Sequence, residues 1–371
     1  MLKDLRKVIY YMLVGANIAT IGLMALTGFS DRFSPDAHPL LSVIGLGFPV
    51  FLLINLTFLV FWVLFKFRTA LVPMAGFIAC LQPIRTYAPV NLNTRAPEDC
   101  LTVMSYNVYL FAGWATPKGE KNEIADYICR SGADIVCLQE GAYHEIQGED
   151  VHQKLKSIYQ YCDTADKDRS NSILAIFSKH PIIKRERIKY ESLNNHSIAH
   201  WLKIGEDTVI VVNNHLETNG LTEEAKSGFK SIISGNLLNS SAKNHSKLLI
   251  EQLTEATRRR MRQADKVAEF IRAHKNEKII LCGDFNDNPI SYAHRTIAKE
   301  LNDCYIASGN GPGFSFHENF MYVRIDNIMC SSHWQPYNCL VDKSIGMSDH
   351  YPIVCKLALK TEENQEKHPT E

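Results

Sequence analysis

Residues 280–289, ILCGDFNDNP, place several polar side chains directly after a predicted buried strand. The strand breaks at Gly283, and two carboxylates and two amides follow, at Asp284, Asn286, Asp287 and Asn288. Glycine relieves a tight bend, and side chains at i and i+2 in extended chain face the same way. Asp284 and Asn286 can therefore act on one bound group, whereas a plain strand end needs only one turn residue.

The ends of other predicted strands carry acid, amide and imidazole groups in the same way. Any one such residue is typical of an ordinary turn, but six sites of this kind in one domain indicate a shared cleft. The other five sites are Asn107 in SYNV, Glu140 in LQE, His215 in NNHLE, Asp326 in RIDNI, and Asp349 with His350 in SDHYP.

Short apolar strands alternate with amphipathic helices from residue 100, and this pattern is typical of an α/β domain. Strands are predicted at 101–108, 134–140, 172–178, 208–216, 278–284, 324–331 and 352–359. Helices are predicted at 120–131, where Gly132 supplies the C-cap, at about 246–274, and from near Ser291. Asp287 and Asn288 are interpreted as turn or capping residues of that last helix.

The ordered set SYNV, LQE, NHLE, GDFN, RIDNI and SDHYP resembles the endonuclease/exonuclease/phosphatase superfamily of DNase I-like phosphoesterases, over about residues 100–360. The resemblance implies a four-layer α/β sandwich in which two packed mixed β-sheets lie between outer helices. It also implies metal-dependent hydrolysis of a phosphoester, most often a phosphodiester. The motifs specify the superfamily and leave the individual substrate open.

The resemblance assigns a metal site to Asn107, Glu140 and Asp349. Glu140 would bind Mg²⁺, with Mn²⁺ as an alternative, and the Asn107 side-chain oxygen would lie beside it. Asp349 would support the metal directly or through its ligands. Mg²⁺ takes one or two carboxylates and keeps several waters, and the scarcity of soft ligands argues against zinc.

The resemblance also assigns the catalytic groups His215, Asp284, Asn286, Asp326 and His350. Asp284 would orient or deprotonate the attacking water, and the Asn286 amide would donate to a phosphate oxygen. His350 would lie at the scissile phosphate, with Asp326 fixing its tautomer and raising its pKa. His215 would contact the phosphate or assist the leaving group.

The first ninety residues are typical of a membrane protein. Segments 8–29 and 40–65 are uncharged and long enough to cross a bilayer, while 69–84 is a shorter third candidate with two prolines. Lys/Arg residues flank the first span on its N-terminal side and the second on its C-terminal side. The positive-inside rule then places the N-terminus in the cytoplasm. If the third segment spans, everything after residue 85 lies outside, which is the favoured arrangement; if it lies in the interface, the catalytic domain is cytoplasmic.

The predicted organisation has a membrane region (1–85) with two to three transmembrane helices, a linker (86–99), the catalytic domain (100–360) and a polar tail (361–371). The predicted location is a bacterial inner membrane with a periplasmic catalytic domain. Ten cysteines lack zinc-type spacing, and Cys137, Cys282 and Cys355 are interpreted as small buried hydrophobes.

Substrate and partners are less determined. Residues after 96 carry 32 Lys/Arg against 37 Asp/Glu, a poor general grip on a nucleic-acid backbone. A lipid, head-group or nucleotide phosphodiester is favoured over extracellular DNA or RNA, and a catalytically silent binding module comes last. The insertion 219–245 would be a flap, a bilayer contact or a packed helix, and Arg258–Arg262 a solvated helix face or a phosphate grip. No protein partner is predicted.

Overall fold

The computed structural model describes residues 2–113, 115, 121–141, 150–166, 172–227, 240–318 and 321–360. The chain packs as two compact units. The first contains Met1–Ala88, Leu221–Arg258 and Asn288–Arg295, and the second contains Pro89–Gly220, Arg259–Asp287 and Thr296–Glu371. The sequence FKSIISGNLL of the predicted insertion lies outside the described residues.

Two helices of the first unit are long and apolar enough to cross a membrane, over Lys3–Gly28 (26 residues) and Pro39–Phe65 (27 residues). A third apolar segment is a helix pair, Phe67–Ala79 and Leu81–Tyr87, bent by 67°. The helices within residues 1–88 are, in chain order, α1 (Leu2–Gly28), α2 (Pro39–Val43), α3 (Phe48–Phe65), α4 (Leu71–Ala79) and α5 (Leu81–Tyr87).

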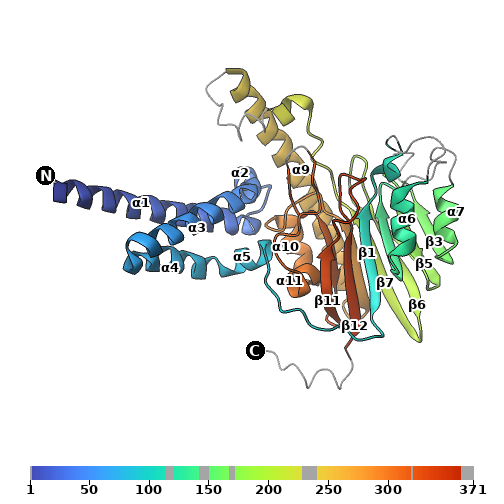
Figure 1. The fold of residues 1–371 in the computed structure, drawn as a ribbon. Coiled ribbons are helices and arrows are strands. Elements are labelled where there is room, and N and C mark those ends of the chain that lie inside the picture. The colour runs from blue at the N-terminus through green and yellow to red at the C-terminus, as the bar shows by residue number, and fades with distance from the viewer. Residues whose placement is uncertain are drawn as a thin grey trace. The chain divides into compact units, whose positions relative to one another are not determined.

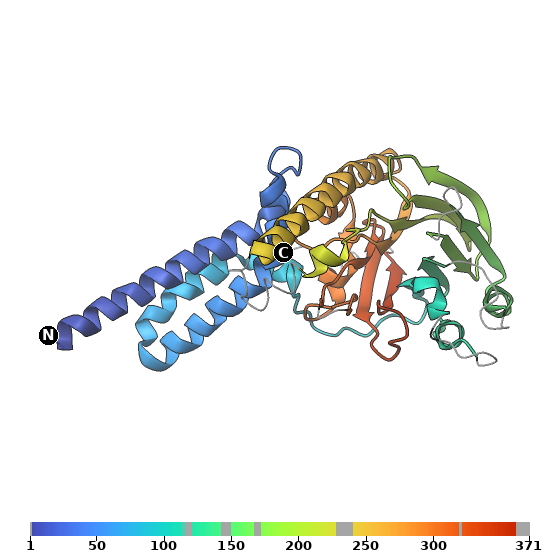
Figure 2. The same ribbon diagram turned by 90° about the horizontal axis from the view of Figure 1, so that it is seen from above.

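Buried amides join α1 and α3, which run side by side in Figure 2. Asn17 Nδ2 donates to Asn55 Oδ1 at 3.0 Å, and Trp62 Nε1 donates to Asn17 Oδ1 at 3.1 Å. Both asparagines are fully buried, so these bonds satisfy polar groups that hydrocarbon would leave unpaired. They hold the two long helices in one register.

The second unit is built on two six-stranded mixed sheets (Figure 1). The first sheet has the order β11-β12-β1-β2-β4-β3, and the second has the order β5-β6-β7-β8-β10-β9. Only β1 with β2 and β7 with β8 pair in parallel; the other neighbours are antiparallel. The strands are β1 (Leu101–Asn107), β2 (Ile135–Gln139), β3 (Tyr161–Ala165), β4 (Leu174–Ser178), β5 (Ile182–Ile188), β6 (Ser197–Ile204), β7 (Asp207–His215), β8 (Lys278–Asp284), β9 (Asn302–Asp303), β10 (Asp326–Cys330), β11 (Trp334–Val341) and β12 (Ile353–Leu359).

Helices cover both sheets and complete the predicted four-layer α/β sandwich. The helices are α6 (Glu123–Arg130), α7 (Val151–Lys156), α9 (Ser240–Ala273), α10 (Tyr292–Ala298) and α11 (Cys304–Ser308). Asn122 caps α6 by accepting from the Ala125 amide, and Gly132, at φ +73°, follows its last turn.

The core between the sheets contains alternate side chains of facing strands, including the predicted small hydrophobes Cys137, Cys282 and Cys355, each fully buried. A second apolar cluster joins the outer face of the first sheet to α6 and α7 through Ile124, Ile128 and Leu155. Burying both faces of the first sheet fixes the direction in which each strand end points.

Candidate active site

One edge of the sandwich receives polar residues from both sheets. The parallel pair β1 and β2 ends there, with Asn107 opposite Gln139 and Glu140 next in the chain, and the parallel pair β7 and β8 ends with His215 opposite Asp284. Strands antiparallel to these begin at the same edge, so Asp326 pairs with Asp284. β12 begins there too, just after His350. The topology thereby gathers residues far apart in sequence.

Asn107 connects the two sheets at this edge. Its Nδ2 donates to Glu140 Oε1 at 3.3 Å and to Asp284 Oδ2 at 3.2 Å, while its Oδ1 accepts from the Tyr109 amide at 3.1 Å. The amide nitrogen therefore faces the carboxylates. A 180° rotation of the amide would exchange the two atoms and present the oxygen to a cation at the same place.

His350 is paired with Asp326, as the sequence predicts. Its Nδ1 lies 2.8 Å from Asp326 Oδ2, and its Nε2 lies 3.7 Å from Asp284 Oδ2. Burial lowers the pKa of His350, but the charges of Asp326 and Asp284 outweigh burial and raise the pKa to about 10. The imidazole is therefore a cation at neutral pH.

His215 has the opposite electrostatic character. Burial lowers the pKa of His215 to about 3, and the charge of His350 adds to that effect. Its Nδ1 lies 3.2 Å from the Ser172 hydroxyl, and its Nε2 lies 3.7 Å from Asp284 Oδ2 and 3.8 Å from Glu140 Oε1. When Ser172 donates to Nδ1, a neutral imidazole presents its Nε2 hydrogen to the carboxylates.

Asp284 lies at the centre of these contacts and is only 1% exposed. Burial raises its pKa to about 7, against the opposing field of His350. Burial likewise raises the pKa of Glu140, whose side chain is 28% exposed. The two carboxyl groups would hold their negative charge more readily if a cation lay beside them.

The glycine of GDFN is required by packing. Gly283 has φ +145°, and a Cβ there would lie 2.0 Å from the Asn214 carbonyl oxygen. Two non-glycine site residues also have positive φ, Glu140 at 54° and Asn286 at 52°. Backbone in this region is costly for side-chain-bearing residues and persists where the surroundings enforce it.

The four polar residues that follow Gly283 have different partners in the structure. Asn286 donates from its side chain to the Leu216 carbonyl at 3.0 Å, and its backbone amide donates to Asp284 Oδ1 at 2.7 Å. Asn288 accepts from the Ile290 amide at 2.7 Å, as a turn residue does. Asp287, for which the sequence predicts a turn or capping role, receives Arg260 Nε on its carboxylate at 3.0 Å.

The SDH segment is attached to the end of β1. Ser348 Oγ donates to the Asn107 carbonyl at 2.7 Å and also contacts Asp349 Oδ1 at 3.3 Å. Phe316 packs edge-on against the His350 ring, with centroids 5.2 Å apart. Ser348 thus fixes the backbone next to Asp349. The charge of Asp349 contributes to raising the pKa of both Glu140 and His350.

Cation-binding chemistry fits this set of donors. Side-chain atoms of Asp284, Asp326 and His350 all lie within 4.8 Å of one another, and the imidazolium of His350 contributes charge there without offering a lone pair. Among the described residues, Asp326 Oδ1 is buried without a hydrogen-bond partner. Four carboxylates and one imidazolium leave excess negative charge, and oxygen donors suit Mg²⁺ or Mn²⁺. Glu140, Asp349 and Asn107 border the same group, so the donors present fit the metal that the sequence predicts.

Buried polar contacts between the two sheets lie next to the site residues Glu140 and His215 in the chain. Gln139 Nε2 donates across the sandwich to Asn213 Oδ1 at 2.7 Å. Asn213 Nδ2 donates in turn to the carbonyls of Leu138 and Ala175, at 3.1 and 3.0 Å. All these groups are buried, so the bonds fix the spacing of β2 and β7, on which Glu140 and His215 depend.

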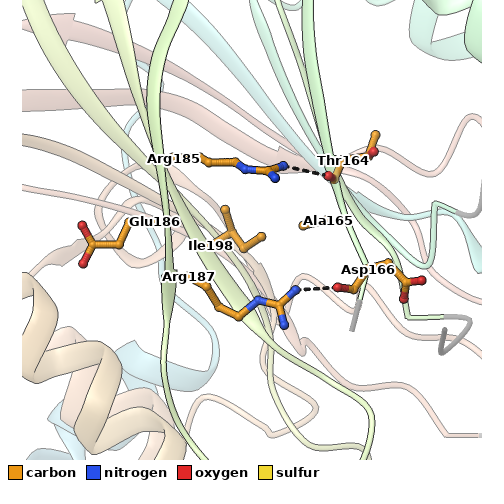
Figure 3. A pocket seen from close by; sticks show the side chains of 7 residues that line it. All are labelled: Thr164, Ala165, Asp166, Arg185, Glu186, Arg187 and Ile198. Carbon is orange, nitrogen blue, oxygen red and sulfur yellow. Dashed lines mark hydrogen bonds between the residues drawn. The ribbon is translucent and has the colours of Figure 1, made fainter. Parts of the chain in front are cut away.

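A separate cavity of about 260 Å³ lies between β3 and β5 (Figure 3). Its two arginines are already engaged: Arg185 pairs with Asp163 at 2.9 Å, and Arg187 donates to the Asp166 carbonyl at 2.5 Å. His200 also pairs with Asp163, at 2.9 Å, so this histidine has a structural partner. The cavity is lined by residues other than those of the carboxylate cluster that contains Asp284, and its arginines already have partners within the protein.

Sequence reasoning missed two residues that border the site. Ser172 contacts His215, but a lone serine ahead of a strand gives no signal. The predicted solvated helix face is wrong for Arg260, which is 2% exposed. Its neighbour Arg258 fits the interpretation better, since it lies 3.9 Å from Glu255.

Comparison with known proteins agrees with this architecture. The sequence matches the Endonuclease/Exonuclease/phosphatase family over residues 104–350, and a domain of unknown function (DUF8431) over residues 7–87. No curated protein matches it.

Two solved structures match this chain over most of their own length. The human Nocturnin catalytic domain with bound sulfate is 19% identical, with a TM-score of 0.52, covering 73% of this chain and 97% of that one. A family protein from Bacteroides thetaiotaomicron is 16% identical, with a TM-score of 0.48, covering 72% and 100%.

Proposed function

Because the chain belongs to the endonuclease/exonuclease/phosphatase family, we propose that it is a membrane-anchored, Mg²⁺-dependent hydrolase of phosphodiesters. The observation that carries this proposal is the convergence of Asn107, Glu140, His215, Asp284, Asp326 and His350 on one edge of the sandwich. The set contains carboxylates for a metal, a carboxyl group with a pKa near neutrality, and an imidazolium. Each of the three can assist hydrolysis of a phosphoester, by stabilising charge, accepting a proton or donating one.

A bound Mg²⁺ would neutralise charge on the phosphate and polarise it toward attack. Glu140, Asp349 and, after rotation of its amide, Asn107 would hold the ion. The predicted role of Asn107 as an oxygen donor therefore requires its side chain to turn from the orientation described above.

Asp284 is proposed to take a proton from the attacking water. Its pKa of about 7 makes its carboxylate available at neutral pH and still basic enough to accept a proton. The Asn286 backbone amide donates to Asp284 Oδ1, which orients the carboxyl plane. The second hydrogen of the Asn286 amide nitrogen remains to meet a phosphate oxygen, since the first is donated to Leu216.

His350 and His215 are proposed to serve the phosphate in different ways. His350, with a pKa of about 10, is a fixed cation beside Asp284 and can protonate the leaving oxygen. His215 is neutral and contributes a hydrogen bond from Nε2. Asp326 orients His350 and stabilises its charge without being consumed, in the manner of a triad carboxylate.

Substrate hydrolysis by the full-length chain in detergent is the decisive test. Residues of the catalytic sequence pack with the membrane region, because Ile290 lies in one cluster with Met24, Phe48 and Cys80, so a truncated chain would expose this cluster. We expect Mg²⁺-dependent cleavage of an activated phosphodiester, loss of activity on chelation, and recovery when Mg²⁺ or Mn²⁺ is returned.

The panel should contain a phosphodiester, a phosphomonoester, DNA, RNA, and phospholipid and sphingolipid vesicles, with Glu140→Gln as the control. Cleavage of lipid or small diesters would support the lipid or head-group reading. Salt-sensitive cleavage of DNA or RNA would support the nuclease alternative, which the burial of Arg260 makes less favourable. Silence across the panel with Mg²⁺ still bound would favour a binding module and contradict the proposal.

A third membrane crossing at residues 67–87 is proposed from contacts inside the first unit. In the first third of α1, the Tyr10 hydroxyl lies 3.2 Å from Thr69 Oγ1. Beyond the C-terminal end of α1, Arg32 donates to Gln82 Oε1 at 2.7 Å. The bent pair therefore runs beside the part of α1 that follows Tyr10, and about 20 residues suffice to cross a bilayer.

The loop after α1 supports a periplasmic catalytic domain. Arg295 lies 3.5 Å from Asp31 of that loop, so the two must lie on the same side of the membrane. With the N-terminus cytoplasmic, that side is the periplasm. We expect a periplasm-active reporter fused after residue 90 to be active and a cytoplasm-active one to be silent. The reverse result would contradict the three-span topology and the predicted inner-membrane orientation.

A further inference from the structure

The middle of α9 presents two buried polar side chains one helical turn apart. Arg260 is 2% exposed and Gln263 is fully buried. Both belong to the second unit, within Arg259–Asp287. A guanidinium in such a place is costly unless its hydrogens are all received by well-placed acceptors.

Arg260 contacts two segments that are far apart in sequence. Its Nε donates to Asp287 Oδ2 at 3.0 Å. One terminal nitrogen, NH1, donates to the Glu217 carbonyl at 3.0 Å and to Asn219 Oδ1 at 2.9 Å. One guanidinium thus joins a carboxylate of one loop to a carbonyl and an amide of the other.

These two segments carry proposed catalytic groups. Glu217 follows His215 by two positions, and Asp287 is the next residue after Asn286. The segments also contact one another directly, since Leu216 donates from its amide to the Asp284 carbonyl at 3.0 Å and accepts from the Asn286 side chain at 3.0 Å. A shift of either segment would therefore move groups on both sides of the reacting phosphate.

Gln263 holds the first segment from the same helix. Its Oε1 accepts from the Glu217 amide at 2.8 Å, and its Nε2 donates to Glu217 Oε2 at 3.1 Å. That carboxylate, 1% exposed, also receives the Ser192 hydroxyl at 2.8 Å and the Leu193 amide at 3.1 Å. Glu217 is therefore fixed at both its backbone and its side chain.

We propose that Arg260 is a positioning residue that holds the segments after His215 and Asp284 in the geometry needed for phosphoester hydrolysis. This inference rests on the proposed function and adds a residue that touches no substrate. The planar guanidinium reaches acceptors in fixed directions, and a lysine ammonium on a flexible stem does not reproduce them. A misplacement of about 1 Å at reacting groups costs on the order of 100-fold in rate.

The test uses full-length Arg260→Lys, with Arg272→Lys as the matched control. Arg272 lies on the same helix and donates to Glu300 at 2.8 Å, away from both segments. We expect Arg260→Lys to lower kcat about 10–100-fold with little change in KM or in Mg²⁺ affinity measured by calorimetry. Hydrogen exchange should rise in peptides covering 213–220 and 284–287 and stay unchanged in β1 and β2. The control should match the wild type in all four measurements.

Asp287→Asn provides a second variant if Arg260→Lys fails to fold, because asparagine keeps an oxygen to accept from Arg260. It should give a smaller kcat loss with exchange changes in the same two peptides. An unchanged kcat, or exchange that rises equally across the whole domain, would overturn the positioning role. An inactive wild-type chain would instead overturn the proposed function, and the exchange measurement would still decide whether Arg260 holds these segments.

Discussion

Asp284→Asn is expected to abolish phosphoester hydrolysis and leave the fold intact. Asparagine preserves the volume and keeps an oxygen to accept from the Asn286 amide, which donates to Asp284 at 2.7 Å. The amide has no basic site, so proton transfer from water is lost, and such transfer contributes about 10²- to 10⁴-fold in rate. One buried hydrogen bond, from Asn107 Nδ2 to Asp284 Oδ2, is lost, which lowers stability without preventing folding.

Wild-type activity should depend on pH in a direction that the pKa of Asp284 determines. Asp284 must be deprotonated to act, so wild-type activity should rise with pH through the pKa of that group, which burial raises to about 7. Bound Mg²⁺ favours the carboxylate form and moves the rise toward lower pH. In Asp284→Asn, the residual activity should lack this rise.

Measurement of kcat against pH, with thermal melting as the folding check, tests the role of Asp284. Asp163→Asn is the matched control, because Asp163 also pairs with a buried histidine, His200, but lies outside the cluster. The control should retain its turnover even if it melts earlier. Full activity in Asp284→Asn would assign the water-orienting role to another group.

Seven strands of the fold were predictable from their apolar runs, whereas β3 and the largely buried β6 were not predicted. β8 was predicted with its observed bounds, and the polar residue types at strand ends identified the edge where the sheets meet. β5 was missed because its sequence, IIKRERI, is an edge strand with charged, exposed positions and no apolar alternation. β11 was missed for a similar reason, since Pro336 and Asn338 interrupt its pattern.

Residue types at the site were predictable, but their partners were not. Asp284 and Asp287 have the same side chain three positions apart, and only the tertiary structure gives one of them an arginine and the other two histidines. Likewise, three consecutive arginines of α9 point in different directions around the helix, and periodicity in sequence does not say which of them is buried. Contacts between distant segments decide these roles, and single-sequence patterns carry no information on them.

Asp326→Asn is expected to shift the alkaline limit of activity to lower pH. The charge of Asp326 is the largest influence that raises the pKa of His350, which burial alone would lower. Asparagine still accepts from Nδ1 through its oxygen, so the ring keeps its orientation while the pKa falls from about 10 toward its ordinary value. Activity that requires imidazolium should then decline at a lower pH than in the wild type.

The raised pKa of His350 should also make the stability of the fold depend on pH. A group whose pKa is higher in the folded than in the unfolded chain stabilises the fold below the unfolded value, near 6.5, and loses that effect as pH rises through about 10. Removing the Asp326 charge reduces this contribution, so the melting difference between wild type and variant should be largest near pH 6.5 and shrink as pH rises toward 10.

Two measurements separate the role of Asp326 from a general loss of packing. An NMR titration of the histidine ring nitrogens should show the His350 signal moving at lower pH in Asp326→Asn, while a ring of unchanged pKa would contradict the pairing. His350→Gln should remove the alkaline decline altogether, because no titrating group remains at that position. Were the decline to persist in His350→Gln, another group would supply the acid, and the neutral His215, with its pKa of about 3, could not be that group.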